Sequence, residues 1–173
     1  MNRVAAHRWM LEKLLGIHRD KLLPEFAQTT FEKWAYKVAL GIGYKVAERV
    51  IANQPVSGGL AFAFSLARFL VLDNVRKIIG VHRMRWAATG AAPISPELIR
   101  WYLALGLPLY EGYGMTESTG GGSINKPGTM RLGSVGKPLP VNEVRISEEG
   151  EILIRGKNVF MGYLNLPEKT RET

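Results

Sequence analysis

Residues 105–117 read LGLPLYEGYGMTE, an apolar run followed at once by aromatic, glycine, hydroxyl and acidic residues. The apolar part, residues 105–109, is short enough to be a buried strand of a parallel sheet. The polar part, residues 110–117, then falls just past the carboxyl end of that strand. Open α/β sheets bind their ligands at this edge, so the stretch predicts a nucleotide site.

The side chains of this stretch suit a nucleotide. Tyr113 offers a flat ring on which a purine can stack. Gly112 and Gly114 lack a Cβ, so a ligand can approach their main chain closely. Thr116 supplies a hydroxyl donor for a phosphate oxygen, and Glu117 would tolerate polyphosphate only with a cation such as Mg²⁺ between them. The alternative interpretation is a tight turn followed by a helix cap.

A second candidate ligand loop lies one βαβ unit upstream. Residues 84–88 have the character of a strand and residues 89–92 that of a tight turn, after which a Ser-Pro-Glu sequence starts a helix that stops at Gly106. With the apolar run as the following strand, the two strands are parallel neighbours. We therefore expect residues 90–93 and 111–117 to meet at one edge of the sheet, although the first loop alone is also a plain strand-to-helix turn.

The rest of the chain is helical before this unit and β-rich after it. Apolar residues spaced by three and four predict helices over residues 8–23 and 30–50, and an apolar segment runs from a turn at 53–59 to Gly80. Alternating residues around a glycine turn predict an antiparallel hairpin within residues 143–155. The expected fold class is α/β, part of a doubly wound, mostly parallel sheet with a helical N-terminal region and the start of an antiparallel β subdomain.

The changes in pattern suggest three parts. We assign residues 1–82 to a helical region, residues 83–126 to the βαβ unit with its ligand loops, and residues 127–173 to the start of a small β-barrel-like subdomain. The glycine-rich residues 118–123 lack the lysine and hydroxyl spacing of a phosphate-binding loop, so a flexible connector is expected there.

Several large side chains are assigned to packing. We expect Phe31 and Trp34 of the second helix to pack in the core, and Trp86 and Trp101 to be core residues in preference to pocket-lining residues. Glycines at positions 41 and 43 are expected to weaken the middle of that helix.

Composition excludes several kinds of site. The chain has no cysteine, which removes disulfides and thiolate nucleophiles and favours a cytoplasmic location. His7, His18 and His82 lack ligand spacing, so a histidine metal site is not expected and all three are assigned to the surface. The net charge of +8 is spread along the chain and interleaved with acidic residues, which argues against nucleic acid as a partner.

Membrane contact is the remaining question that charge and hydropathy raise. The longest apolar run, within residues 60–72, is interrupted by Ser65 and Arg68 and is judged too short to span a bilayer. A basic amphipathic face in the helical region leaves peripheral contact with anionic lipid open, and plain solvation is the alternative.

Five motifs occur in a characteristic order. They are GAAPI at residues 90–94, EGYGMTE at 111–117, GSVGKP at 133–138, GEILIRG at 150–156 and MGY at 161–163. Together they resemble the adenylate-forming, AMP-binding superfamily, and within it the AMP-forming long-chain fatty acyl-CoA synthetases. The specific motifs cover roughly residues 84–173.

The resemblance implies a reaction and a set of site residues. ATP, a fatty acid and coenzyme A would give acyl-CoA, AMP and pyrophosphate through an acyl-adenylate, with Mg²⁺ as cofactor. Thr116 and Glu117 would be the catalytic residues, and Glu117 the metal ligand. The implied nucleotide-binding residues are Gly90, Ala91, Ala92, Glu111, Gly112, Tyr113, Gly114, Met115 and Thr116.

The same resemblance implies parts that this chain lacks. Residues 1–82 contain no Ser/Thr/Gly-rich loop ending in lysine, and neither the ribose-binding aspartate segment nor the small domain with the catalytic lysine follows residue 173. We therefore expect an internal fragment that is inactive alone, with homodimerisation as one way to cover its edges. The alternatives are a fragment of an aryl or amino acid adenylating enzyme, and a non-catalytic nucleotide- or lipid-binding module.

Overall fold

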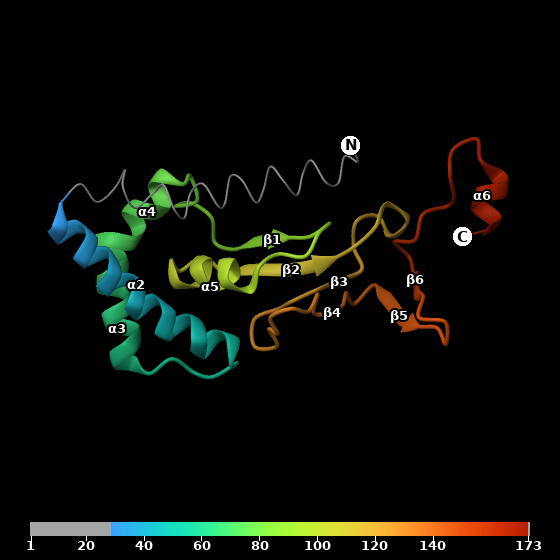
Figure 1. The fold of residues 1–173 in the computed structure, drawn as a ribbon. Coiled ribbons are helices and arrows are strands. Elements are labelled where there is room, and N and C mark those ends of the chain that lie inside the picture. The colour runs from blue at the N-terminus through green and yellow to red at the C-terminus, as the bar shows by residue number, and fades with distance from the viewer. Residues whose placement is uncertain (1–28, 173) are drawn as a thin grey trace.

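The computed structural model describes residues 29–172 of the chain. Helices gather at one end, a small sheet occupies the middle, and a hairpin followed by a short helix forms the other end (Figure 1). The helix predicted over residues 8–23, with His7 and His18, lies outside the described residues, whereas His82 is exposed as expected. The three-part domain division stays a prediction.

The first described helix, α2 (Thr30–Ile51), starts with a capping box. The Oγ1 of Thr29 accepts a hydrogen bond from the Glu32 backbone N–H at 3.2 Å, and the Glu32 carboxylate accepts one from the Thr29 N–H at 2.9 Å. Gly43 lies where α2 meets α5 (Pro96–Ala104), and a Cβ there would overlap the Ala104 carbonyl. This glycine permits close helix packing, whereas Gly41 faces open space.

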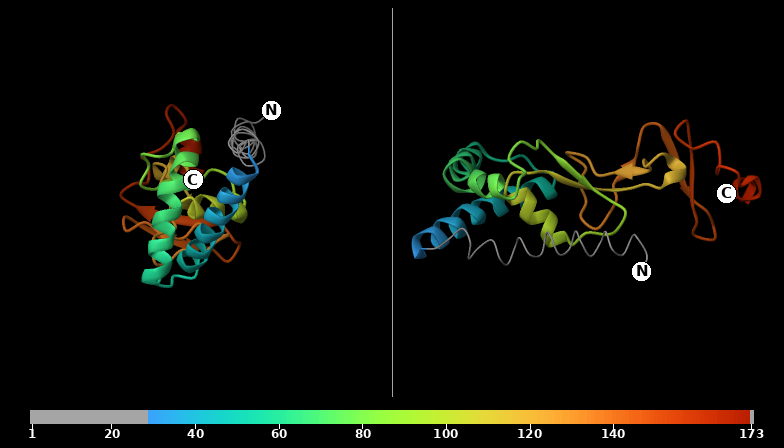
Figure 2. Two further views of the ribbon diagram at one scale, coloured as in Figure 1. Left: turned by 90° about the vertical axis from the view of Figure 1, so that its left-hand side faces the viewer. Right: turned by 90° about the horizontal axis from the view of Figure 1, so that it is seen from above.

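A second helical rod lies beside α2 (Figure 2). It consists of α3 (Gly58–Ala67), the π-helical turn η1 (Arg68–Leu72) and α4 (Asp73–Ile78). The continuous stretch Gly58–Ile78 has 21 residues and is long and apolar enough to cross a membrane, by length and composition alone. Only 17% of the most apolar part is buried inside the structure.

The expectation that this segment is too short and too interrupted was therefore wrong. The helix continues through Arg68 because arginine interrupts the apolar run but is a good helix former, and its guanidinium pairs with Asp73 at 3.2 Å. Core helices of soluble proteins meet the same criterion, so this finding assigns no location to the chain.

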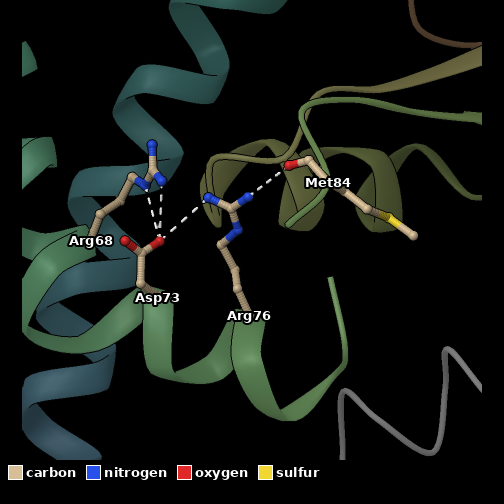
Figure 3. A network of polar contacts seen from close by, with 4 residues as sticks. All are labelled: Arg68, Asp73, Arg76 and Met84. Atoms are coloured by element: carbon tan, nitrogen blue, oxygen red, sulfur yellow. Dashed lines mark hydrogen bonds and ion pairs between the residues drawn. The ribbon is translucent and has the colours of Figure 1, made fainter. Parts of the chain in front are cut away.

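A polar network joins this rod to the sheet (Figure 3). Arg76 is buried, and its guanidinium donates to the carboxylate of Asp73 at 3.3 Å and to the Met84 carbonyl at 3.0 Å. Burial, followed by the charge of Arg68, lowers the pKa of Arg76. Because Met84 lies three residues before β1 (Ala87–Thr89), the network fixes where the chain enters the sheet.

The βαβ prediction is confirmed. Strand β1 pairs in parallel with β2 (Leu109–Tyr113), with Ala87 opposite Leu109 and Thr89 opposite Glu111, and α5 connects them. Strand β2 runs four residues beyond the predicted apolar run at 105–109, so Tyr110, Glu111, Gly112 and Tyr113 lie on the strand and not beyond it. The extension forms because the end of β2 also pairs with β3 (Ser123–Ile124).

The sheet is mixed. Its order is β1-β2-β3-β4, where β4 (Lys137–Pro138) pairs antiparallel with β3. The predicted hairpin is present as β5 (Asn142–Ile146) and β6 (Ile152–Gly156), followed by α6 (Pro167–Glu172). The α/β class is confirmed, although β1 and β2 form the one parallel pair among residues 29–172.

The core lies between α5, β2 and the helical rods. Trp101 is buried as predicted, and its indole N–H donates to the Tyr36 hydroxyl at 3.2 Å. The core assignment was wrong for Phe31, Trp34 and Trp86, whose exposed fractions are 72%, 60% and 60%. Helical spacing identifies an apolar face but does not show what covers it. Phe31 and Trp34 line an open apolar cavity of about 710 Å³ between α2 and the second rod.

Candidate nucleotide site

Glu111 joins the two predicted ligand loops. It lies on β2 opposite Thr89, its side chain is 6% exposed, and its carboxylate accepts a hydrogen bond from the Ile94 backbone N–H at 3.3 Å. The loop after β1 is thereby tied to β2, so of the predicted meeting between residues 90–93 and 111–117 the structure shows this loop in contact with Glu111 and Gly112. The contact also gives Glu111 a role within the chain that the sequence did not reveal.

The loop after β1 is tight and strained. A Cβ on Gly90 would lie 2.9 Å from the Gly112 carbonyl oxygen, so the two main chains can approach only at a glycine. Ala91 has φ of +65°, a left-handed conformation that costs an alanine on the order of 1–2 kcal/mol. Strained residues of this kind cluster at ligand sites. Ala91 is exposed and Ala92 is half-buried, so both can be reached from solvent.

Tyr113 ends β2 and is half-buried. Strand alternation places it on the same face of β2 as Glu111. Its ring lies beside the backbone of Gly122, where a Cβ would be 3.1 Å from the ring Cδ1. One atom of the ring thus lies close to main chain, and a stacking role for the ring stays a prediction.

Close contacts within the chain explain why positions 112 and 114 of the motif are glycine. A Cβ on Gly112 would lie 2.9 Å from the Ser123 carbonyl oxygen, and one on Gly114 would overlap the Gly120 carbonyl. Gly112 thus lets β3 lie close to β2, and Gly114 lets the turn after β2 fold back tightly. Approach of a ligand to the same main chain stays a prediction.

A compact turn carries the hydroxyl and carboxylate. Thr116 and Glu117 begin the 3₁₀ turn η2 (Thr116–Ser118). The backbone N–H of Met115, the residue just before this turn, donates to the Ser118 hydroxyl at 3.3 Å. Thr116 is exposed and Met115 is half-buried. The Gly122 N–H donates to the Tyr113 carbonyl at 2.9 Å and closes the turn back onto β2.

Two asparagines fix this turn from the hairpin side. The Asn158 amide donates to the carbonyls of Ser118 and Gly121, each at 2.8 Å, and the Asn142 amide donates to Gly121 at 2.7 Å and to Gly122 at 3.0 Å. The expected flexible connector at residues 118–123 is therefore a tied-down turn. No local sequence pattern identifies either asparagine, because each contacts residues at least 20 positions away in the sequence.

Glu117 is half-buried and paired. Its carboxylate accepts a hydrogen bond from the Tyr163 hydroxyl at 2.5 Å, and its carbonyl accepts one from the Phe160 N–H at 2.8 Å. The Tyr163 hydroxyl, followed by the backbone amide of Glu117, lowers the pKa of this carboxyl. Glu117 is therefore ionised at neutral pH.

This carboxylate fits Mg²⁺ only as part of a shared site. Among residues 29–172 no three side chains of His, Cys, Asp or Glu lie close enough together to hold a metal ion. Mg²⁺ binds through one or two carboxylates when substrate phosphates and water supply the other ligands. One ionised carboxylate beside the candidate ligand loop meets that requirement.

Comparison with known proteins gives the site its context. Residues 24–164 match the family model of AMP-binding enzymes. The long-chain-fatty-acid–CoA ligase ACSBG2 of Gallus gallus is 45% identical over 114 residues, which are 63% of this chain and 15% of that protein. The human long-chain-fatty-acid–CoA ligase 6 is 34% identical over 175 residues, 94% of this chain and 24% of that protein.

A solved structure is also similar. The Mycobacterium tuberculosis fatty acyl CoA synthetase is 27% identical, with a TM-score of 0.49 over 58% of this chain and 23% of that chain. The present chain thus spans a quarter or less of the length of these proteins. Since the family model covers most of its residues, the chain belongs to the family of AMP-binding enzymes.

Proposed function

We propose that this chain supplies the adenylate-binding part of an AMP-forming long-chain fatty acid–CoA ligase. The hydrogen bond between Glu111 and the Ile94 N–H carries the proposal, because it joins two motif loops at the carboxyl ends of a parallel strand pair. The similar curated proteins named as long-chain-fatty-acid–CoA ligases support the substrate class.

The proposed site has a base end and a phosphate end. The purine would stack on Tyr113, with the main chain of residues 90–92 and 111–112 alongside it. Gly114, Met115 and Thr116 would border the phosphates, with the Thr116 hydroxyl as a donor to a phosphate oxygen. Glu117 would hold Mg²⁺, which supplies charge neutralisation on the polyphosphate.

The proposed chemistry has two steps. The fatty carboxylate attacks the α-phosphorus of ATP and releases pyrophosphate, and the thiol of coenzyme A then displaces AMP from the acyl-adenylate. Such steps depend on positioning and charge stabilisation more than on a protein nucleophile. Residues of this chain would orient the nucleotide for both steps.

Calorimetric titration with AMP and with a non-hydrolysable palmitoyl-adenylate analogue tests the proposal. Tyr113→Ala should weaken AMP binding by about 5- to 150-fold, because base stacking contributes roughly 1–3 kcal/mol. Tyr113→Phe keeps the ring and should bind within a few-fold of the unmodified chain. Equal binding by Tyr113→Ala would refute the stacking assignment.

The acyl part of the analogue separates the alternatives. Preference for palmitoyl- over benzoyl- and aminoacyl-adenylate analogues supports a fatty acid ligase, and the reverse order supports an aryl or amino acid enzyme. Lipid binding without adenylate binding supports a non-catalytic module.

We further propose a cytoplasmic location, with peripheral membrane contact or self-association at the exposed apolar helices.

A further inference from the structure

The segment that follows β6 grips the turn that carries Glu117. The Asn158 carbonyl accepts a hydrogen bond from the Thr119 hydroxyl at 2.6 Å while the Asn158 side chain donates to Ser118 and Gly121. Two residues later the Phe160 N–H donates to the Glu117 carbonyl. The main chain on both sides of Glu117 is therefore set by residues about 40 positions away in the sequence.

Tyr163 also contacts this turn, and the direction of its side chain is fixed by other contacts. Its backbone N–H donates to the Thr170 hydroxyl at 2.9 Å, and its ring meets that of Phe160 edge-on, with centroids 4.8 Å apart at 85°. Gly162 before it has φ of +144°, and a Cβ there would overlap Thr170. The Tyr163 hydroxyl is thus aimed by backbone and ring contacts that do not involve Glu117.

We propose that Tyr163 is a positioning residue: its hydroxyl holds one oxygen of the Glu117 carboxylate and so orients the other oxygen toward a nucleotide-bound divalent cation. The proposal rests on the proposed function for the identity of the cation complex. The hydrogen bond itself stands on the 2.5 Å geometry between Tyr163 and Glu117.

The hydroxyl can be separated from the packing of the ring. Tyr163→Phe keeps the edge-on contact with Phe160 and the backbone bond to Thr170, and it removes the hydroxyl that donates to Glu117. Tyr102→Phe is the matched control, because it removes the same atom from a residue of α5 in the core. Thermal unfolding of each variant reports whether the fold is retained.

The first measurement follows the Glu117 side chain by NMR in the 173-residue chain. Three-bond couplings should show a single χ1 rotamer in the unmodified chain and in Tyr102→Phe, and averaging over staggered rotamers in Tyr163→Phe. A single rotamer that persists in folded Tyr163→Phe would overturn the proposal. Should that variant not fold, Glu117→Ala tests the bond from the other side: a slowly exchanging Tyr163 hydroxyl proton should disappear, and its persistence would overturn the proposal.

The second measurement compares ATP affinity with Mg²⁺ and with EDTA. Tyr163→Phe should lower the Mg²⁺-dependent gain in affinity about tenfold, as loss of one hydrogen bond to a charged group would, and leave the affinity in EDTA unchanged. A purely structural role would lower both. If the couplings behave as expected but the unmodified chain binds no nucleotide, the proposed function fails, and of the positioning role only the hold of Tyr163 on the Glu117 carboxylate stands.

Discussion

Glu111 shows how a motif residue can serve the fold and the ligand site at once. Its carboxylate is buried and accepts from the Ile94 N–H, so it holds the loop after β1 against β2. The resemblance implies Glu111 among the nucleotide-binding residues. The structure adds a contact within the chain, by which this side chain ties the loop after β1 to β2.

The Glu111→Leu substitution tests that role. It leaves the Ile94 N–H without its acceptor, so we expect a loss of roughly 1–3 kcal/mol in the free energy of unfolding and no detectable AMP binding. Glu111→Gln keeps a carbonyl acceptor and should retain most of both. Urea denaturation and calorimetric titration provide the two measurements, and a Glu111→Leu chain that binds AMP normally would contradict this account.

The Glu117 carboxyl predicts a pH dependence. Its pKa in the folded chain is lowered, chiefly by the Tyr163 hydroxyl, so the stabilising contribution is complete above the ordinary glutamate value of 4.5 and is lost as pH falls through the depressed value. Tyr163→Phe should therefore be less stable than the unmodified chain at pH 7, and the difference should shrink at pH 3. Thermal melts at both pH values measure it. A difference that does not change with pH would show that the hydroxyl does not act through the Glu117 charge.

Some site residues could be assigned from the sequence and others could not. The two groups differ in how far apart along the sequence their interacting residues lie. Tyr113, Thr116 and Glu117 were recognisable because their types and order occur within a few positions. The role of Asn158 and the pairing of Tyr163 with Glu117 depend on contacts across 37 to 46 residues, which no local pattern records. Tyr163 lay within a recognised motif, but its partner became visible only in the fold.

At the scale of elements, hydrophobic pattern located the βαβ unit but misplaced its strand ends. Strand β2 was expected to end with the apolar run at Leu109, since polar residues usually mark the start of a loop. It continues to Tyr113 because Gly112 and Tyr113 pair with β3 on the far side. Pairing with a neighbour decides where a strand ends. That neighbour, β3, follows a nine-residue turn that Asn142 of the hairpin β5–β6 holds through a hydrogen bond to the Gly121 carbonyl.

The two glycines of α2 give a matched test of element packing. Gly43→Ala places a Cβ against the Ala104 carbonyl of α5, so we expect a loss of roughly 1–3 kcal/mol in the free energy of unfolding. Gly41→Ala meets nothing within 4 Å and should instead stabilise α2 by about 0.5–1 kcal/mol. Urea denaturation of both variants is the measurement. Equal effects would mean that the close approach of α2 to α5 does not exist in solution.

At the scale of the whole molecule, the sequence pattern predicted side-chain burial least well at the helical end. Its apolar residues were expected to be core, yet several large ones on α2 and α3 are exposed, and the stretch Gly58–Ile78 is mostly unburied. The matched curated proteins are about four to seven times longer than the aligned part of this chain. Sequence pattern shows that a face is apolar, and only the surrounding structure shows what it packs against.

This exposed face predicts self-association of the 173-residue chain. Phe62 and Phe69 are 74% and 79% exposed on one rod, and contiguous apolar surface of this kind associates in water. Sedimentation equilibrium should show concentration-dependent oligomers for the unmodified chain and a shift to monomer for the double variant Phe62→Ser/Phe69→Ser. The control is Met161→Ser/Leu164→Ser, which removes exposed apolar side chains near the other end and should leave association unchanged. If the unmodified chain is monomeric and instead sediments with anionic vesicles in a Phe62- and Phe69-dependent manner, the same face contacts lipid and the self-association prediction is wrong.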